Sequence, residues 1–231
     1  MSPHPHFVGP IYCETGHPWL GMAEPVNTIT NAAIIIAAYF AYRHVRRSRA
    51  GFSADLVVLL VLLAAVGIGS TLWHGLRTMW ALQLDWMPGV AFLIVFAALW
   101  MRRLYGWGAG IGGSLLMIVG AVAAVRYSWP YFDRLHGVSP NLRFTPAFAV
   151  ITLFAVAMVL ATARKYGGEA ARQGTAILLC ALGAAVARSI DLMACPYVPT
   201  GTHFLWHLLL STAAFLGILL LVRLKTARAG A

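Results

Sequence analysis

Seven long apolar stretches, separated by short polar segments, dominate the pattern of hydrophobic and polar positions along the chain. Each is about as long as the roughly 20 apolar residues that a helix needs to cross a bilayer. The period-two alternation typical of membrane β-barrel strands is not evident. We therefore predict an all-α bundle of seven transmembrane helices. Their expected positions are residues 26–45, 54–74, 84–101, 107–126, 144–163, 173–192 and 202–222.

Composition narrows the class of protein further. Of the 231 residues, 60% are apolar and only 10% are charged, whereas soluble domains are about half apolar and about a quarter charged. So few charged side chains argue against a water-soluble enzyme of this size. The net charge of +10 comes from short Lys and Arg clusters between apolar runs, without a continuous basic face. Nucleic acid is therefore not an expected partner.

The distribution of Lys and Arg predicts the orientation of the helices. Twelve of the 17 basic residues fall on one side of the predicted membrane: Arg43, Arg46, Arg47, Arg49, Arg102, Arg103, Arg164, Lys165, Arg172, Arg223, Lys225 and Arg228. By the positive-inside rule that side is cytoplasmic, so we predict the N-terminus outside and the C-terminus inside. The expected organisation is an outer N-terminal segment at 1–25, a seven-helix domain at 26–222 and a basic cytoplasmic tail at 223–231.

The connection at 127–143 is the longest one and is predicted to be an outer loop. The predicted membrane is the plasma or inner membrane.

Unusual polar residues gather toward the exoplasmic side of this membrane, although they come from five different helices. They are Glu24, Asn27, Ser70, His74, Asp85, Asp191, His203 and His207. Ionisable groups at membrane depth are costly and usually face the interior of a bundle, so this gathering predicts a functional site.

The spacing of the histidines suggests metal chemistry. His203 and His207 are four residues apart and share one helical face, so both imidazoles can reach one ion. His74, from another helix, would complete a three-histidine site. Three histidines with an open fourth position are the catalytic pattern for zinc, whereas structural zinc sites have four protein ligands.

Two further side chains, Asp85 and Ser70, could take part in catalysis beside such an ion. Asp85 follows His74 by eleven residues, across a short turn predicted to contain Gly75, and could return to the same level. Its carboxylate could take a proton from water that zinc makes acidic. Ser70 precedes His74 by one helical turn and could donate a hydrogen bond to an oxyanion.

Several of these residues lie in motifs that resemble a known family. The motifs are Ser70-Thr-Leu-Trp-His74, Leu84-Asp85, Gly201-Thr-His-Phe-Leu-Trp-His207, Cys13-Glu14, Glu24-Pro-Val-Asn-Thr28, and Asp191 with Cys195. Together they resemble the alkaline ceramidases. That family belongs to a larger group of seven-helix hydrolase-like membrane proteins, which includes the adiponectin and progestin receptors. The likeness follows the whole chain in order and in helix count.

The resemblance implies an amidase that cleaves ceramide into a sphingoid base and a free fatty acid. His74, His203 and His207 would bind zinc, Asp85 would be the acid and base, and Ser70 would stabilise the oxyanion or help to hold the metal. The family also pairs cysteines. Cys13 and Cys195 are both predicted outside, where an oxidising compartment permits a disulfide.

The same family can carry a calcium site made by acidic residues near the N-terminus. Glu14 and Glu24 fall on matching positions, but Ile11 stands where an Asp is expected and Gly16 replaces an Asn. A hard cation prefers six or more oxygen ligands, so two carboxylates with backbone carbonyls would bind calcium only weakly.

Other functions remain open from the sequence. One is a lipid-sensing receptor of the same fold with structural zinc, and another is a hydrolase for a different N-acyl lipid. An intramembrane serine hydrolase with Ser70, His74 and Asp85 as a triad leaves two histidines idle and lacks the G-x-S-x-G elbow. A membrane cytochrome is disfavoured, because His203 and His207 cannot lie on opposite faces of one haem. The sequence does not indicate the oligomeric state.

Overall fold

The computed structural model describes residues 11–133 and 140–229. Within these ranges the chain is helical, and its extended structure is limited to an isolated bridge between Trp19 and Met22. The helices are α1 (Pro25–Thr30), α2 (Ala32–Arg47), α3 (Ala54–Leu76), α4 (Met79–Tyr105), α5 (Trp107–Asp133), α6 (Thr145–Tyr166), α7 (Gly168–Ala194) and α8 (His203–Ala229), with the 3-10 helix η1 (Pro140–Phe144) before α6. The predicted all-α class is confirmed.

The predicted multi-pass membrane architecture is supported by helix length and hydropathy. In the described part of the chain, six helices, α3 to α8, are long and apolar enough to cross a bilayer. The first predicted span, 26–45, is divided into α1 and the 16-residue α2. Asn31 lies at the division, and its buried side chain donates a hydrogen bond to the carbonyl oxygen of Asn27 at 2.9 Å.

Two predicted boundaries are wrong. Helix α4 begins at Met79 instead of residue 84, and α3 continues through Gly75, so the turn between them consists of Arg77 and Thr78. Helix α5 continues to Asp133, although we predicted a loop from residue 127. Pro130 does not end α5 because proline is tolerated inside membrane helices. Residues 134–139 of the predicted loop, together with 1–10 and 230–231 of the predicted termini, lie outside the described residues.

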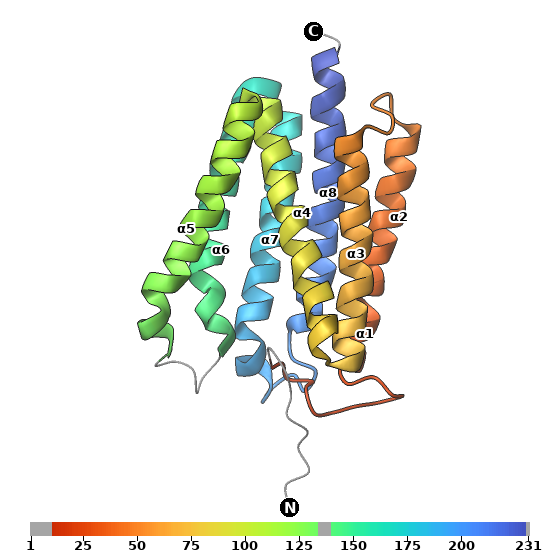
Figure 1. Ribbon diagram of the computed structural model, residues 1–231, viewed down its shortest axis with the longest axis vertical. Coiled ribbons are helices and arrows are strands. Elements are labelled where there is room, and N and C mark those ends of the chain that lie inside the picture. The colour runs from red at the N-terminus through yellow and green to blue at the C-terminus, as the bar shows by residue number, and fades with distance from the viewer. Residues whose placement is uncertain (1–10, 134–139, 230–231) are drawn as a thin grey trace, which may run out of the picture.

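Helix α8 lies between α2 and α7 and also contacts α1, α3 and α4, whereas α5 and α6 pack on the other side of α7 and α4 (Figure 1). The apolar core occupies the half of the bundle nearer the end of α8. It includes Leu56 and Leu59 of α3 and Leu220, Leu221 and Leu224 of α8, all without solvent exposure. Between membrane helices such side chains stabilise the bundle mainly by close van der Waals packing, because lipid tails are as apolar as leucine.

Large apolar side chains also cover outward surfaces of the bundle. Leu116 on α5 and Leu153 on α6 are each 71% exposed, and Val61 on α3 is 62% exposed. An exposed apolar surface of this extent is unfavourable in water and favourable in lipid. The outer faces of these helices are therefore suited to contact with acyl chains.

Polar side chains gather at the opposite end of the bundle from the apolar core. Helices α3 and α7 end there, α4 and α8 begin there, and residues 11–24 run across the same end (Figure 1). Helix α3 stops because Arg77 adopts a left-handed conformation with φ +52°. The chain thus brings side chains that are distant in sequence to one level.

Candidate metal centre

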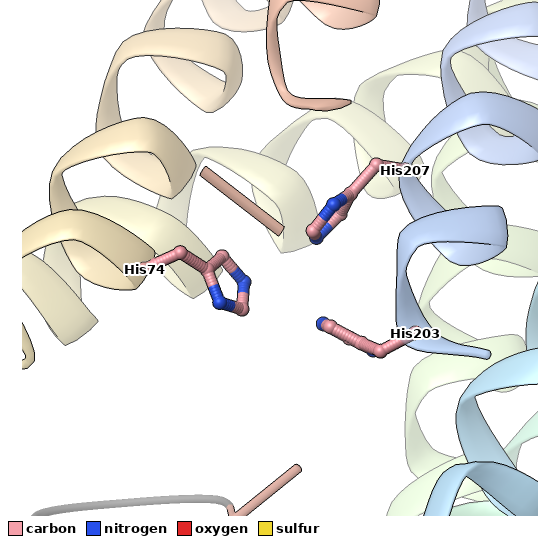
Figure 2. A group of neighbouring side chains, drawn as sticks. All are labelled: His74, His203 and His207. Atoms are coloured by element: carbon pink, nitrogen blue, oxygen red, sulfur yellow. The ribbon is translucent and has the colours of Figure 1, made fainter. Parts of the chain in front are cut away.

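Three buried imidazoles meet at the polar end of the bundle. His74 comes from the last turn of α3, and His203 and His207 come from the first two turns of α8. Their exposures are 1%, 2% and 1%, and one ligand atom from each lies within 4.8 Å of the others. Figure 2 shows the three rings around a common space, with ring nitrogens directed toward it. The predicted convergence of the three histidines is confirmed.

Asp191 fixes the beginning of α8, and with it the position of His203. Its carboxylate Oδ1 accepts hydrogen bonds from the backbone N–H groups of Thr202 at 2.7 Å and His203 at 2.8 Å. A carboxylate at a helix N-terminus satisfies free N–H groups and complements the helix dipole. Gly201 precedes this turn at φ +67°, where an added Cβ would collide with the Asp191 carboxylate and with Cys13. Asp191, one of the polar residues predicted to gather at this level, is therefore a helix cap.

Hydrogen bonds orient two of the three rings. The Thr30 hydroxyl donates to the carbonyl oxygen of Val26 at 2.8 Å, which leaves its oxygen to accept from Nδ1–H of His207 at 3.0 Å. Nδ1–H of His74 donates to Oε2 of Glu24 at 2.5 Å. In both rings this assignment puts the proton on Nδ1 and leaves Nε2 as a free ligand atom.

The ligand atoms fit a metal ion of the zinc type. Among the described residues, Nε2 of His207 is buried and has no hydrogen-bond partner. Zinc lies about 2.0–2.1 Å from imidazole nitrogens, which puts tetrahedral ligands about 3.3 Å apart. A contraction of about 1 Å per ring from the observed spacing is enough to reach that geometry. An unpaired buried nitrogen is costly, and a metal ion would satisfy it.

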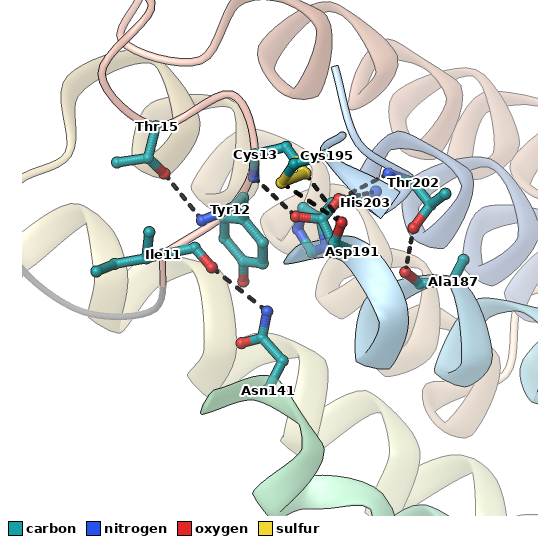
Figure 3. The surroundings of a disulfide bond; sticks show 10 residues. All are labelled: Ile11, Tyr12, Cys13, Thr15, Asn141, Ala187, Asp191, Cys195, Thr202 and His203. Carbon is teal, nitrogen blue, oxygen red and sulfur yellow. Dashed lines mark hydrogen bonds between the residues drawn. A yellow bond between two sulfur atoms is a disulfide. The ribbon is translucent and has the colours of Figure 1, made fainter. Parts of the chain in front are cut away.

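A covalently fixed N-terminal segment covers the centre. The structure joins Cys13 to Cys195 by a disulfide bond across 182 residues (Figure 3). The backbone N–H of Cys13 also donates to Oδ2 of Asp191 at 2.9 Å. Tyr12, 4% exposed, stacks on His203 with ring centroids 3.7 Å apart. Asn141 donates from its side chain to the carbonyl oxygen of Ile11 at 3.3 Å.

We expect the disulfide to stabilise this cover. Cys13→Ser should lower the Tm in detergent by on the order of 10 °C, because the bond closes a long loop and removes conformational freedom from the unfolded chain. Differential scanning fluorimetry checks this result. Cys180→Ser is the matched control, since Cys180 is the free cysteine of the described residues. A Cys13→Ser protein with the Tm of the wild type would contradict the expected contribution.

Glu14 and Glu24 form hydrogen bonds with the protein itself. The Glu14 carboxylate accepts from the backbone N–H groups of Val26 at 2.6 Å and Asn27 at 2.9 Å, so it caps α1. The Glu24 carboxylate accepts from Thr15 and His74 and lies 3.1 Å from Nη1 of Arg77. A guanidinium beside Glu24 repels a second cation, so the described residues do not favour calcium here.

The pKa of Glu24 reflects these partners. Burial raises the pKa of this carboxyl, but the hydrogen bonds from His74 and Thr15 and the charge of Arg77 oppose that effect, and the pKa lies below its usual value. Glu24 is therefore ionised at neutral pH. Asn27, another of the polar residues predicted to gather at this level, is fully buried, and its side-chain nitrogen lies 3.5 Å from Oε2 of Glu24.

Ser70 lies on α3 and Asp85 on α4, and these two helices approach closely beside Ser70. Ser70 is 3% exposed and precedes His74 by one turn of α3. A Cβ at Gly69 would clash with the carbonyl group of Leu84, so α4 passes directly against α3 beside Ser70. Asp85 is half-buried in the second turn of α4. It is not a member of the three-histidine group.

The charge of Asp85 contributes to the pKa of Tyr12, in the N-terminal segment that covers the centre. Burial raises the pKa of the Tyr12 phenol, the charge of Arg188 lowers it, and the charges of Asp85 and Glu24 raise it. Asp85 therefore lies within electrostatic reach of the ring that stacks on His203.

Sequence reasoning missed several residues of the centre. Thr30, the partner of His207, and Tyr12, which stacks on His203, carried no signal as isolated residues. Glu24 was included among the polar residues, but its contact with His74 was not predicted. One signal was present in the sequence: Glu24, Asn27 and Asn31 recur at helical spacing, which marks a buried polar face.

The fold and the centre define a class: a multi-pass helical membrane protein with a buried three-histidine site at one end of the bundle. A protein-family model described as Ceramidase matches residues 12–231. The chain therefore belongs to the ceramidase family, of the alkaline type. A comparison with curated proteins finds no match. Membership implies a hydrolase that acts on an amide bond of a lipid such as ceramide.

Proposed function

We propose that the protein is a zinc-dependent intramembrane amidase that hydrolyses ceramide to a sphingoid base and a free fatty acid. The observation that carries the proposal is the buried group of His74, His203 and His207, with Nδ1 of two rings hydrogen-bonded and Nε2 free. Three imidazole ligands leave a fourth position open, which is typical of catalytic zinc. The ceramidase family supplies the substrate class.

The chain's own residues have separate roles in this proposal. His74, His203 and His207 would hold the ion, which when bound acidifies water and polarises a carbonyl oxygen. Asp85 takes the proton from the attacking water and returns it to the leaving nitrogen. Ser70 donates a hydrogen bond to the amide oxygen as negative charge develops there. Tyr12 and the disulfide-linked segment restrict the access of bulk water to the imidazoles.

The membrane setting suits a lipid amide. Ceramide can reach the site sideways from the bilayer, while water arrives from the end of the bundle that carries the centre. We propose that this end faces the exoplasmic or periplasmic side of the plasma or inner membrane. The support is the basic clusters near the other ends of α2, α4, α6 and α8.

Zinc analysis combined with a hydrolysis assay tests the function. We expect purified protein in detergent to contain about one zinc per chain and to cleave a fluorescent ceramide into a sphingoid base and a fatty acid. Zinc without hydrolysis would indicate a lipid-sensing receptor instead. Hydrolysis that survives removal of the metal would indicate a serine mechanism, and cleavage only of another N-acyl lipid would change the substrate.

A further inference from the structure

A buried ion pair lies directly behind His74. Nη1 of Arg77 is 3.1 Å from Oε1 of Glu24, and the side chains are 4% and 0% exposed. The other carboxylate oxygen, Oε2, accepts Nδ1–H of His74 at 2.5 Å. One carboxylate therefore connects a guanidinium to an imidazole of the candidate metal centre. The two oxygens of Glu24 have different partners, so the orientation of the carboxylate depends on both.

Arg77 reaches Glu24 from an unfavourable backbone conformation at the end of α3. Arg77 ends α3 with φ +52° and ψ +41°, a left-handed conformation in which glycine is the usual residue. Its N–H donates to the carbonyl oxygen of Trp73 at 2.8 Å, and its guanidinium stacks over the Trp73 ring at 4.0 Å. The stacking on Trp73 and the ion pair with Glu24 offset the cost of this conformation.

Glu24 is held on the other side by the backbone. Its N–H donates to the carbonyl oxygen of His74, and the N–H of Ala23 donates to that of Gly75, both at 3.0 Å. These bonds fix where the main chain of residue 24 lies, but they leave its side-chain rotamer free. The ion pair with Arg77 and the hydrogen bond to Thr15 restrict that rotamer.

We propose that Arg77 is a positioning residue of the metal centre: its ion pair fixes the Glu24 carboxylate, which holds the His74 ring with Nε2 toward the ion. The inference rests on the proposed function, because it assumes zinc at the three histidines. Carboxylates that accept from a ligating histidine orient the ring and raise its basicity, and their loss typically weakens metal binding 10–100-fold. Arg77 would affect zinc binding indirectly, through its ion pair with the Glu24 carboxylate.

The test measures zinc affinity, by competition with a chromogenic chelator, in the full-length protein in detergent. We expect Arg77→Met to weaken zinc binding by about tenfold and to broaden the visible spectrum of the cobalt-substituted protein. Arg77→Lys keeps the charge but loses the planar guanidinium group, so the zinc affinity of this variant should lie between those of the wild type and the Arg77→Met protein. The Tm of the metal-free proteins shows whether the fold is retained.

Arg103→Met is the matched control. Arg103 is also a buried arginine paired with a carboxylate, Asp55, at 2.6 Å, but it lies in the last turn of α4, at the other end of the bundle. Its loss should lower the Tm and leave zinc affinity unchanged. A merely structural role for Arg77 would give the same pattern as this control.

A double-mutant cycle tests whether Arg77 affects zinc binding through Glu24. If Arg77 acts through Glu24, adding Arg77→Met to a Glu24→Gln protein should not weaken zinc binding further. An Arg77→Met protein with wild-type affinity and cobalt spectrum would overturn the inference while leaving the proposed function intact. So would an additive loss in the double variant. A wild-type protein that binds no zinc would overturn both.

Discussion

Replacing His203 by alanine is expected to remove both zinc and ceramide hydrolysis. His203 provides one of three imidazoles in a centre whose ligand atoms lie within 4.8 Å of one another. Two remaining imidazoles, His74 and His207, cannot complete a catalytic zinc site. We expect zinc to fall from about one per chain to near zero and hydrolysis to fall below detection. Elemental analysis and the fluorescent ceramide assay on the same preparation measure both results.

His44→Ala is the control for this variant. His44 is exposed near the end of α2 that carries basic residues, so it lies far from the centre along the bundle. We expect His44→Ala to keep zinc content and hydrolysis. Full hydrolysis by the His203→Ala protein would show that the three-histidine centre is not the site of the reaction.

Replacing Asp85 by asparagine should separate metal binding from turnover. Asp85 is outside the three-histidine group, so the variant should retain about one zinc per chain. Asparagine has nearly the same shape but cannot accept or return a proton at neutral pH. General acid–base catalysis contributes about 10²–10⁴-fold to a rate, so kcat for ceramide should fall by that factor. Single-turnover measurements on zinc-loaded protein check the prediction.

Asp55→Asn provides the comparison for a carboxylate with a structural role. Asp55 pairs with Arg103 at the other end of the bundle. Its substitution should lower the Tm and leave kcat of the folded protein nearly unchanged. An Asp85→Asn protein that hydrolyses ceramide at the wild-type rate would remove Asp85 from the mechanism, and one that also loses zinc would give it a ligand role.

The fold was largely predictable because apolar runs of bilayer length determine membrane helices. The run at 54–74 corresponds to α3 within two residues, and the run at 202–222 to α8, which continues through Ala229 into the predicted tail. The break at Asn31, whose side chain donates a hydrogen bond to the carbonyl oxygen of Asn27, was not predictable from hydropathy. The extension of α5 through Pro130 was missed because proline signals a loop in soluble proteins but is tolerated in membrane helices.

The candidate site was only partly predictable. The histidines could be found because four-residue spacing and equal membrane depth are properties of the sequence pattern. Contacts that orient the rings depend on tertiary packing: Thr30 reaches His207 from a helix 177 positions away in the chain. The position of Arg77 depends on its left-handed conformation at the end of α3, whereas we predicted a short turn containing Gly75. Such local geometry carries no periodic signal.

The most direct test of the account is an X-ray absorption spectrum at the zinc edge of the purified, zinc-loaded protein. The account predicts three imidazole nitrogens and one oxygen at about 2.0–2.1 Å from the metal, with one imidazole fewer in any zinc retained by the His203→Ala protein. Sulfur ligands at about 2.3 Å, or fewer than three imidazoles in the wild type, would contradict a catalytic centre made by His74, His203 and His207.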